Sequence, residues 1–154
     1  MSHTPLFQPL DAAYAQRIRE SFERQGLMRH LGARLADVQP GITEIRAKRR
    51  DELTQQHGYF HAGVSAALAD SACGYAAYTL MPADASVLTV EYKINLLAPA
   101  NGEELIARAR VIRSGRTLKV CLADVFTRSD GSEVHCATML ATVICLPGKC
   151  DRPG

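Results

Sequence analysis

The sequence predicts an α+β fold in which one antiparallel sheet of six strands wraps around a single long helix, with one additional helix before it. Two observations predict this architecture. The segment from His61 to Thr79 is apolar around almost its whole helical circumference, so this helix must be enclosed on most sides. The chain before and after it alternates apolar and polar residues, as strands with one wet face do. A sheet that curls around the helix satisfies both patterns.

The composition is that of an ordinary soluble domain. Of the 154 residues 47% are apolar and 22% charged, and a net charge of +2 gives no reason to expect nucleic acid as a partner. Residues 1–9 lack a basic segment followed by an apolar run, and no stretch is long and apolar enough for a membrane span. Five cysteines without a C-x-x-C pair suit a reducing compartment. We therefore expect one cytoplasmic domain over residues 1–154.

The first elements are a helix and a hairpin. Apolar residues recur every four positions and Gly26 follows as a stop, which predicts an amphipathic helix over about residues 10–25. The core then extends over about residues 27–147. It begins with two alternating strands around the turn Pro40-Gly41. The apolar positions of the helix are Leu10, Tyr14, Ile18 and Phe22.

Four further strands follow the central helix in the style of a meander. Their turn signals are Asn101-Gly102, Ser114-Gly115 and Asp130-Gly131. The last two strands, residues 117–127 and 133–146, carry apolar side chains on both faces, as expected where one face meets the helix and the other a second subunit. The first of the four alternates, with one face formed by Leu88, Val90, Tyr92, Ile94 and Leu96.

Asp70 is the candidate for chemistry. It lies about two and a half turns inside the apolar helix, where an ionised carboxylate is costly without partners, so it is either paired structurally or used in catalysis. At the helix start, the backbone N–H groups of Ala62 and Gly63 are expected to be unpaired. Such a helix end can stabilise a developing oxyanion.

These residues carry a resemblance to a known family. The segment H-A-G-x-x-x-x-x-x-D, which ends at Asp70, resembles the H-G-G-x-x-x-x-x-x-D signature of PaaI-like hotdog-fold acyl-CoA thioesterases, and the similarity extends over nearly the whole chain. The resemblance implies hydrolysis of a fatty or aromatic acyl-CoA thioester. It implies Asp70 as general base or nucleophile, the Ala62 amide as the group that polarises the thioester carbonyl, and Gln55 as an assisting side chain. Ala62 replaces the middle Gly, and its methyl group narrows the space beside the thioester.

Helix geometry predicts that the active site needs two subunits. Ala62 and Asp70 are eight residues apart, about 12 Å along the helix axis at roughly 1.5 Å per residue. One thioester carbon cannot contact both in a single chain. If oxyanion donor and base reach one reacting centre, they come from two helices that run side by side, which fits a homodimer or a homotetramer built as a dimer of dimers.

The remaining polar candidates have alternative roles. His61 either caps the helix or contacts the substrate carbonyl. His57 and His61 are four residues apart, but no third metal ligand is obvious, so we expect no metal and no cofactor. Arg113, Arg116 and Lys93 are candidates to bind the phosphates of CoA, although exposed cations are commonly only solvated.

Two other functions share these features. The replacement of Gly by Ala62 is compatible with a non-catalytic hotdog module that binds acyl-CoA or an acyl carrier. A hotdog hydratase or dehydratase would have the same architecture with a different placement of its catalytic groups. Release of free thiol from a thioester separates the hydrolase from both.

Overall fold

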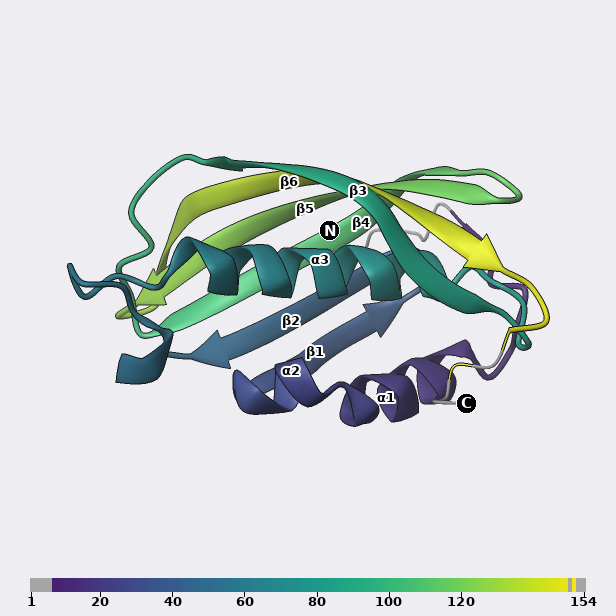
Figure 1. The fold of residues 1–154 in the computed structure, drawn as a ribbon, viewed down its shortest axis with the longest axis horizontal. Coiled ribbons are helices and arrows are strands. Elements are labelled where there is room, and N and C mark those ends of the chain that lie inside the picture. The colour runs from purple at the N-terminus through teal and green to yellow at the C-terminus, as the bar shows by residue number, and fades with distance from the viewer. Residues whose placement is uncertain (1–6, 150, 152–154) are drawn as a thin grey trace.

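The computed structural model describes residues 7–149 and residue 151, and one sheet wraps around one long helix as predicted. Six antiparallel strands curve around the helix α3 (Figure 1). The core lies between the concave face of the sheet and α3, where Ile45, Leu68 and Val143 are fully shielded from solvent. Cys150, one of the five cysteines, lies outside the described residues.

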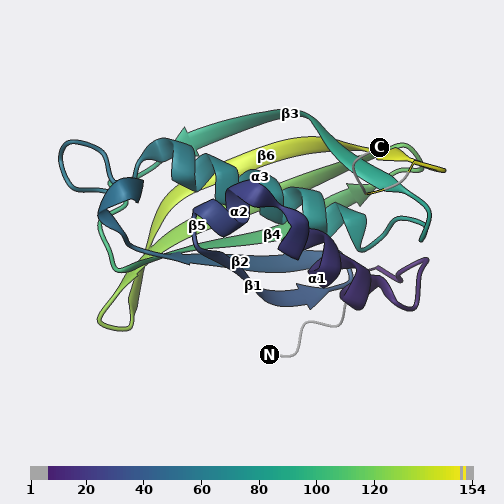
Figure 2. The same ribbon diagram turned by 60° about the horizontal axis from the view of Figure 1, so that its bottom comes forward.

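Two short helices precede the sheet where the sequence predicted one. The helix α1 (Tyr14–Arg24) begins four residues later than expected, and Leu10 lies outside it with 72% of its surface exposed. The extended backbone of Gln25 ends α1, and Gly26 then begins a second helix, α2 (Gly26–His30), rather than stopping helical structure. Figure 2 shows α1 and α2 alongside β1 and α3.

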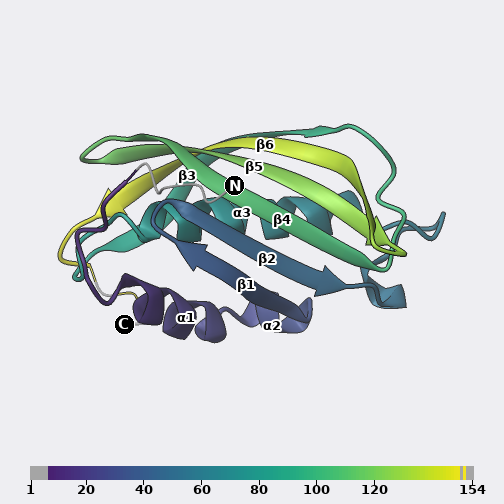
Figure 3. The ribbon, with the colours of Figure 1, turned by 180° about the vertical axis from the view of Figure 1, so that it is seen from behind.

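The sheet has the strand order β1-β2-β4-β5-β6-β3, and every neighbouring pair is antiparallel. The meander prediction is correct for β4 to β6 but wrong for β3, which pairs with β6 at the far edge while β4 pairs with β2 (Figure 3). The reason is that α3 crosses the concave face between β2 and β3 and carries the chain to that edge. The strands are β1 (Ala33–Gln39), β2 (Ile42–Lys48), β3 (Ser86–Leu96), β4 (Glu104–Ser114), β5 (Leu118–Ser129) and β6 (Ser132–Leu146).

Three of the four predicted turns, Pro40-Gly41, Ser114-Gly115 and Asp130-Gly131, join paired strands, whereas Asn101-Gly102 lies between β3 and β4, which do not pair. Asp130 and Gly131 have positive φ angles of 50° and 78°, the backbone that a two-residue turn between antiparallel strands requires. Gly41, with φ of 75°, makes the turn between β1 and β2. The strand predictions at residues 117–127 and 133–146 are confirmed to within two residues at each end.

A β-bulge in β3 changes which side chains share a face. The pairing of β3 with β6 shifts between Thr89 and Glu91. In the part of β3 that precedes this shift, the predicted alternation is therefore wrong. Thr89 shares a face with Tyr92, whereas Leu88 lies on the opposite face with Lys93. The bulge turns Thr89 toward α3.

Candidate active site

The central helix α3 (Ala62–Tyr78) confirms the helix predicted from His61 to Thr79. His61 and Thr79 are its N-cap and C-cap residues. One side of the helix packs against the sheet. The expectation that almost all of its surface is enclosed is wrong, because one stripe of small residues faces outward between β3 and the N-terminal helices. Asp70 is half-buried in the middle of this stripe, whose members are Ala62, Gly63, Ala66, Ala67, Asp70 and Gly74.

His61 caps the start of α3, which was one of the two roles predicted for it. The Gly63 N–H donates to His61 Nδ1 at 2.8 Å, so the expectation that this amide is unpaired is wrong. Among the described residues, the Ala62 N–H has no hydrogen-bond acceptor. A neutral His61 that accepts at Nδ1 carries its proton on Nε2 and remains a donor. The helix start thus offers one free backbone donor and one imidazole donor.

Gln55 lies beside this helix end in a compact loop. Its N–H donates to the carbonyl of Tyr59 at 2.8 Å, and its side-chain Oε1 accepts from the N–H of His57. With Oε1 engaged, the Nε2 group of Gln55 is the part left to donate to a ligand. A cleft of about 580 Å³ lies at this end of α3. It is smaller than the cleft of about 730 Å³ that Asp70 lines. The smaller cleft brings Gln55, His61 and Ala62 together.

Asp70 lies in the larger cleft and has one hydrogen-bond partner on β3. The hydroxyl of Thr89 donates to Asp70 Oδ1 at 2.7 Å. Sequence reasoning did not select Thr89, because strict alternation puts it on the other face and only the bulge brings it here. A carboxylate beside a hydroxyl at the wall of an open cleft can hold and activate a water molecule.

The two clefts are separate within one chain. Ala62 lines only the smaller cleft and Asp70 only the larger one, and the two sets of lining residues do not overlap. The eight-residue separation along α3, which the sequence already required, is therefore a separation between two clefts.

The three candidate cations for CoA lie away from both clefts within this chain. Arg113 and Arg116 are exposed near the β4–β5 turn, and Arg116 lines a third cleft with Leu80. Lys93 is exposed on the face of β3 opposite Thr89 and donates to Asn95. The structure does not bring these cations to Asp70 of their own chain.

Buried thiols fill gaps between α3 and the sheet. All four described cysteines are free and buried, where a thiol packs as a small apolar group. A hydrogen bond with Cys121, together with burial, raises the pKa of the Cys73 thiol.

In the described part of the chain, no three metal-ligating side chains lie together. None of the described helices is long and apolar enough to cross a membrane.

Comparison with known proteins places this arrangement in a family. Residues 57–134 match the thioesterase superfamily. A Halobacterium salinarum protein named as a candidate esterase is 33% identical over 131 residues, which cover 81% of this chain and 86% of that protein. A 1,4-dihydroxy-2-naphthoyl-CoA hydrolase of Listeria monocytogenes is 28% identical over 62% of this chain and 77% of its own length.

Solved structures agree with the sequence matches. The crystal structure of a thioesterase family protein from Silicibacter pomeroyi has a TM-score of 0.86 and 50% identity, covering 88% of this chain and 99% of that one. The PaaI protein of E. coli, at 18% identity, shares the fold with a TM-score of 0.79 over 91% of this chain and 98% of its own. The resemblance read from the H-A-G segment and Asp70 is confirmed. The chain belongs to the thioesterase superfamily, as a thioester hydrolase with the hotdog fold.

Proposed function

We propose that this protein hydrolyses fatty or aromatic acyl-CoA thioesters to the free acid and CoA, with Asp70 as general base or nucleophile. One observation carries the assignment of Asp70. Its carboxylate is half-buried on the open stripe of α3, accepts a hydrogen bond from Thr89, and lines a cleft large enough for an organic ligand. The hydrolase of Listeria monocytogenes, whose name gives a CoA thioester as its substrate, supports the choice of CoA.

The complete site is proposed to form between two protomers. The edge strand β3 has no strand partner on its outer side among the described residues, yet it exposes Leu88, Val90 and Leu96. An exposed apolar edge of this length invites pairing with another strand. Pairing with β3 of a second copy is isologous and would bring two α3 helices side by side, with Asp70 of one copy facing Ala62 of the other. A homodimer is therefore the smallest active unit, and a homotetramer would pair two of them.

The proposed reaction uses the groups of both clefts. Water held by Asp70 gives up a proton to the carboxylate while its oxygen bonds to the thioester carbon. The Ala62 N–H holds the developing oxyanion, with Gln55 Nε2 and His61 Nε2 as further donors, while Gly63 supports His61. The C–S bond then breaks, and the CoA sulfur takes the proton. In the nucleophilic route, the Asp70 oxygen forms a mixed anhydride that water hydrolyses. Neither route requires a cofactor.

The proposal also covers the residues that bind CoA and the cellular location of the protein. Arg113, Arg116 and Lys93 would bind CoA phosphates from whichever protomer presents them to the shared site. A cytoplasmic location is supported by the four buried free thiols, which suit a reducing compartment.

The test replaces Asp70 with Asn, which keeps the size and removes the charge. We expect thiol release from acyl-CoA to fall at least about 100-fold, the scale of a lost general base, while the elution volume of the dimer stays unchanged. Asp37→Asn is the matched control, because Asp37 is a carboxylate on β1 that bonds only Gln39. Undiminished turnover in Asp70→Asn would exclude the assignment.

A further inference from the structure

Lys119 on β5 is a buried cation that takes part in none of the ion pairs among the described residues. Only 3% of its surface is exposed, and its partner across the strand pair is Val143, which is fully shielded on the concave side of the sheet. Its Nζ donates to the carbonyl oxygen of Gly115 at 3.1 Å. An ammonium group has three N–H donors, and a lysine is rarely this buried unless it is paired. Part of its bonding capacity is therefore left for a ligand.

Lys119 lines the third cleft, which has a volume of about 340 Å³ and lies beside the segment that follows α3. Its lining residues are shared neither with the Asp70 cleft nor with the smaller cleft at Ala62. Lys119 and Arg116 are the two charged residues in the lining, and both are cations. The apolar part of the lining consists of Phe7, Leu10, Leu80, Pro82, Cys145 and Pro147.

We propose that the third cleft is a second ligand site, which binds a small carboxylate with an apolar body. The carboxylate would accept a charge-assisted hydrogen bond from Lys119 Nζ, and it would supply the negative charge that the lining lacks. The apolar body would cover Leu80 and Cys145, each of which is 4% exposed. This proposal is independent of the proposed function, because it involves neither Asp70 nor Ala62.

The size and the lining of the cleft argue against the nucleotide end of CoA as its ligand. Clefts that bind small organic molecules have volumes of about 300–1,000 Å³, and this one is at the lower end of that range. The oxygens of several phosphate groups would also lie against apolar side chains, which cannot donate hydrogen bonds to them. A single carboxylate needs fewer donors. The site depends on Lys119, so the exposed Arg116 can still contact CoA as proposed above.

The experiment compares three probes that separate the charge from the chain. Octanoate has both, 1-octanol has the chain without the charge, and acetate has the charge without the chain. We expect octanoate to bind the wild type at least about 10-fold more tightly than either other probe. That factor is the scale of one hydrogen bond between charged groups, or of about two buried methylene groups. Octanoate binding no tighter than 1-octanol or acetate would overturn the proposal.

Methyl NMR spectra of the same titrations show which cleft octanoate occupies. Leu80 lines the third cleft and Leu88 lines the Asp70 cleft, so their methyl resonances report the two sites separately. We expect the Leu80 resonances to shift as octanoate is added. Shifts confined to Leu88 would overturn the proposal and leave the proposed function intact, because octanoate would then bind only where the free acid is released.

Lys119→Met tests the ammonium group itself. Methionine is unbranched and suits a buried position, so the variant removes the charge and keeps most of the packing. We expect octanoate to bind at least about 10-fold more weakly at Leu80, the scale of one hydrogen bond between charged groups. Lys48→Met is the control, because Lys48 is exposed at the end of β2 and outside this cleft.

Unchanged octanoate binding by Lys119→Met would contradict the proposal. If this variant fails to fold, the comparison of the three probes on the wild type decides the question.

Discussion

At the scale of single residues, the site depends on a contact between two elements that are distant in sequence. Asp70 is 19 residues before Thr89, and their hydrogen bond joins α3 to the edge strand β3. The contact fixes one oxygen of the carboxylate, and in the proposed mechanism the other oxygen acts on water. His61 is a similar case, since it uses Nδ1 to cap the helix and keeps Nε2 available for a ligand.

Thr89→Val should lower the activity without disrupting the fold. Valine has almost the same shape and favours a strand, but it cannot donate to Asp70, so we expect kcat/KM to fall about 10-fold, as for the loss of one hydrogen bond to a charged group. Steady-state thiol release measures the change. Thr142→Val is the control, because Thr142 on β6 bonds Glu91 instead. Equal activity of the two variants would show that the Thr89 hydroxyl is dispensable.

At the scale of elements, β3 is both a wall of the Asp70 cleft and an unpaired edge of the sheet. Its bulge turns Thr89 inward, and its exposed apolar side chains lie where a second copy is proposed to pair. Ser21 of α1 and Gln25 at the junction of α1 and α2 line the same cleft. Catalysis and assembly would therefore depend on neighbouring segments.

Val90→Lys should separate the protomers of the proposed dimer. Val90 is 57% exposed on β3, and a lysine on an edge strand opposes pairing with another strand. We expect sedimentation velocity to show monomers, with loss of thiol release because Asp70 and Ala62 no longer share a site. Val134→Lys is the matched control, since Val134 is 52% exposed but lies on β6. A Val90→Lys dimer with full activity would argue against assembly through β3.

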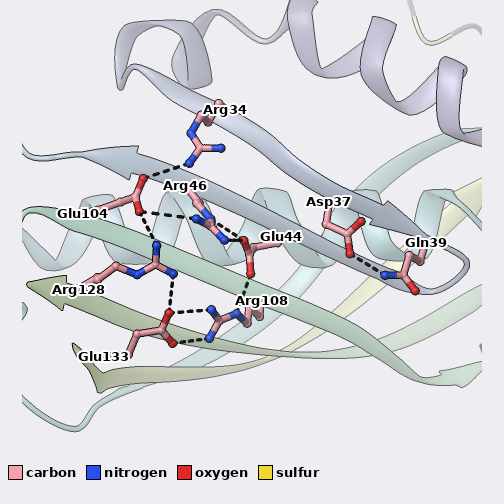
Figure 4. Close-up of polar contacts among 9 residues, drawn as sticks. All are labelled: Arg34, Asp37, Gln39, Glu44, Arg46, Glu104, Arg108, Arg128 and Glu133. Carbon is pink, nitrogen blue, oxygen red and sulfur yellow. Dashed lines mark hydrogen bonds and ion pairs between the residues drawn. The ribbon is translucent and has the colours of Figure 1, made fainter. Parts of the chain in front are cut away.

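At the scale of the whole molecule, an ion-pair network covers the outer face of the sheet at one end. Arg108 and Arg128 both donate to Glu133, and Arg108 also donates to Glu44 (Figure 4). The network joins β2, β4, β5 and β6 through side chains, on the face opposite α3. The hydrogen bonds from Arg108 and Arg128 lower the pKa of Glu133 from its ordinary value of 4.5 to about 2.

This lowered pKa predicts a loss of stability in acid. Folding favours the ionised form of Glu133, so its stabilising contribution is complete above about pH 4.5 and declines as the pH falls toward 2. Urea unfolding at several pH values should therefore show a steeper acid loss in the wild type than in Glu133→Gln, which has no charge to lose. Glu52→Gln serves as control, because Glu52 is exposed and outside this network. Parallel pH profiles for wild type and Glu133→Gln would contradict the prediction.

The sequence by itself determined the central helix and the six strands, but not the division of the N-terminal helix into two. The apolar wheel of residues 61–79 required a helix packed against the sheet, although it gave no sign of the open stripe around Asp70, and the two-residue alternation required strands with one solvent-exposed face. It also determined that Ala62 and Asp70 cannot meet within one chain, because a helix fixes their separation. These conclusions depend on local periodicity and helix geometry, and both can be worked out from a short segment of the sequence.

Only the tertiary structure decided the features that depend on contacts between distant parts of the chain. A bulge of one residue reversed the face of Thr89, and periodicity contains no signal for it. The position of β3 at the far edge followed from the path of α3, and the place of Ser21, Gln25 and Tyr75 in the Asp70 cleft followed from the packing of α1 and α2. These contacts join residues far apart in the chain, and their free energies come from packing rather than from local propensity.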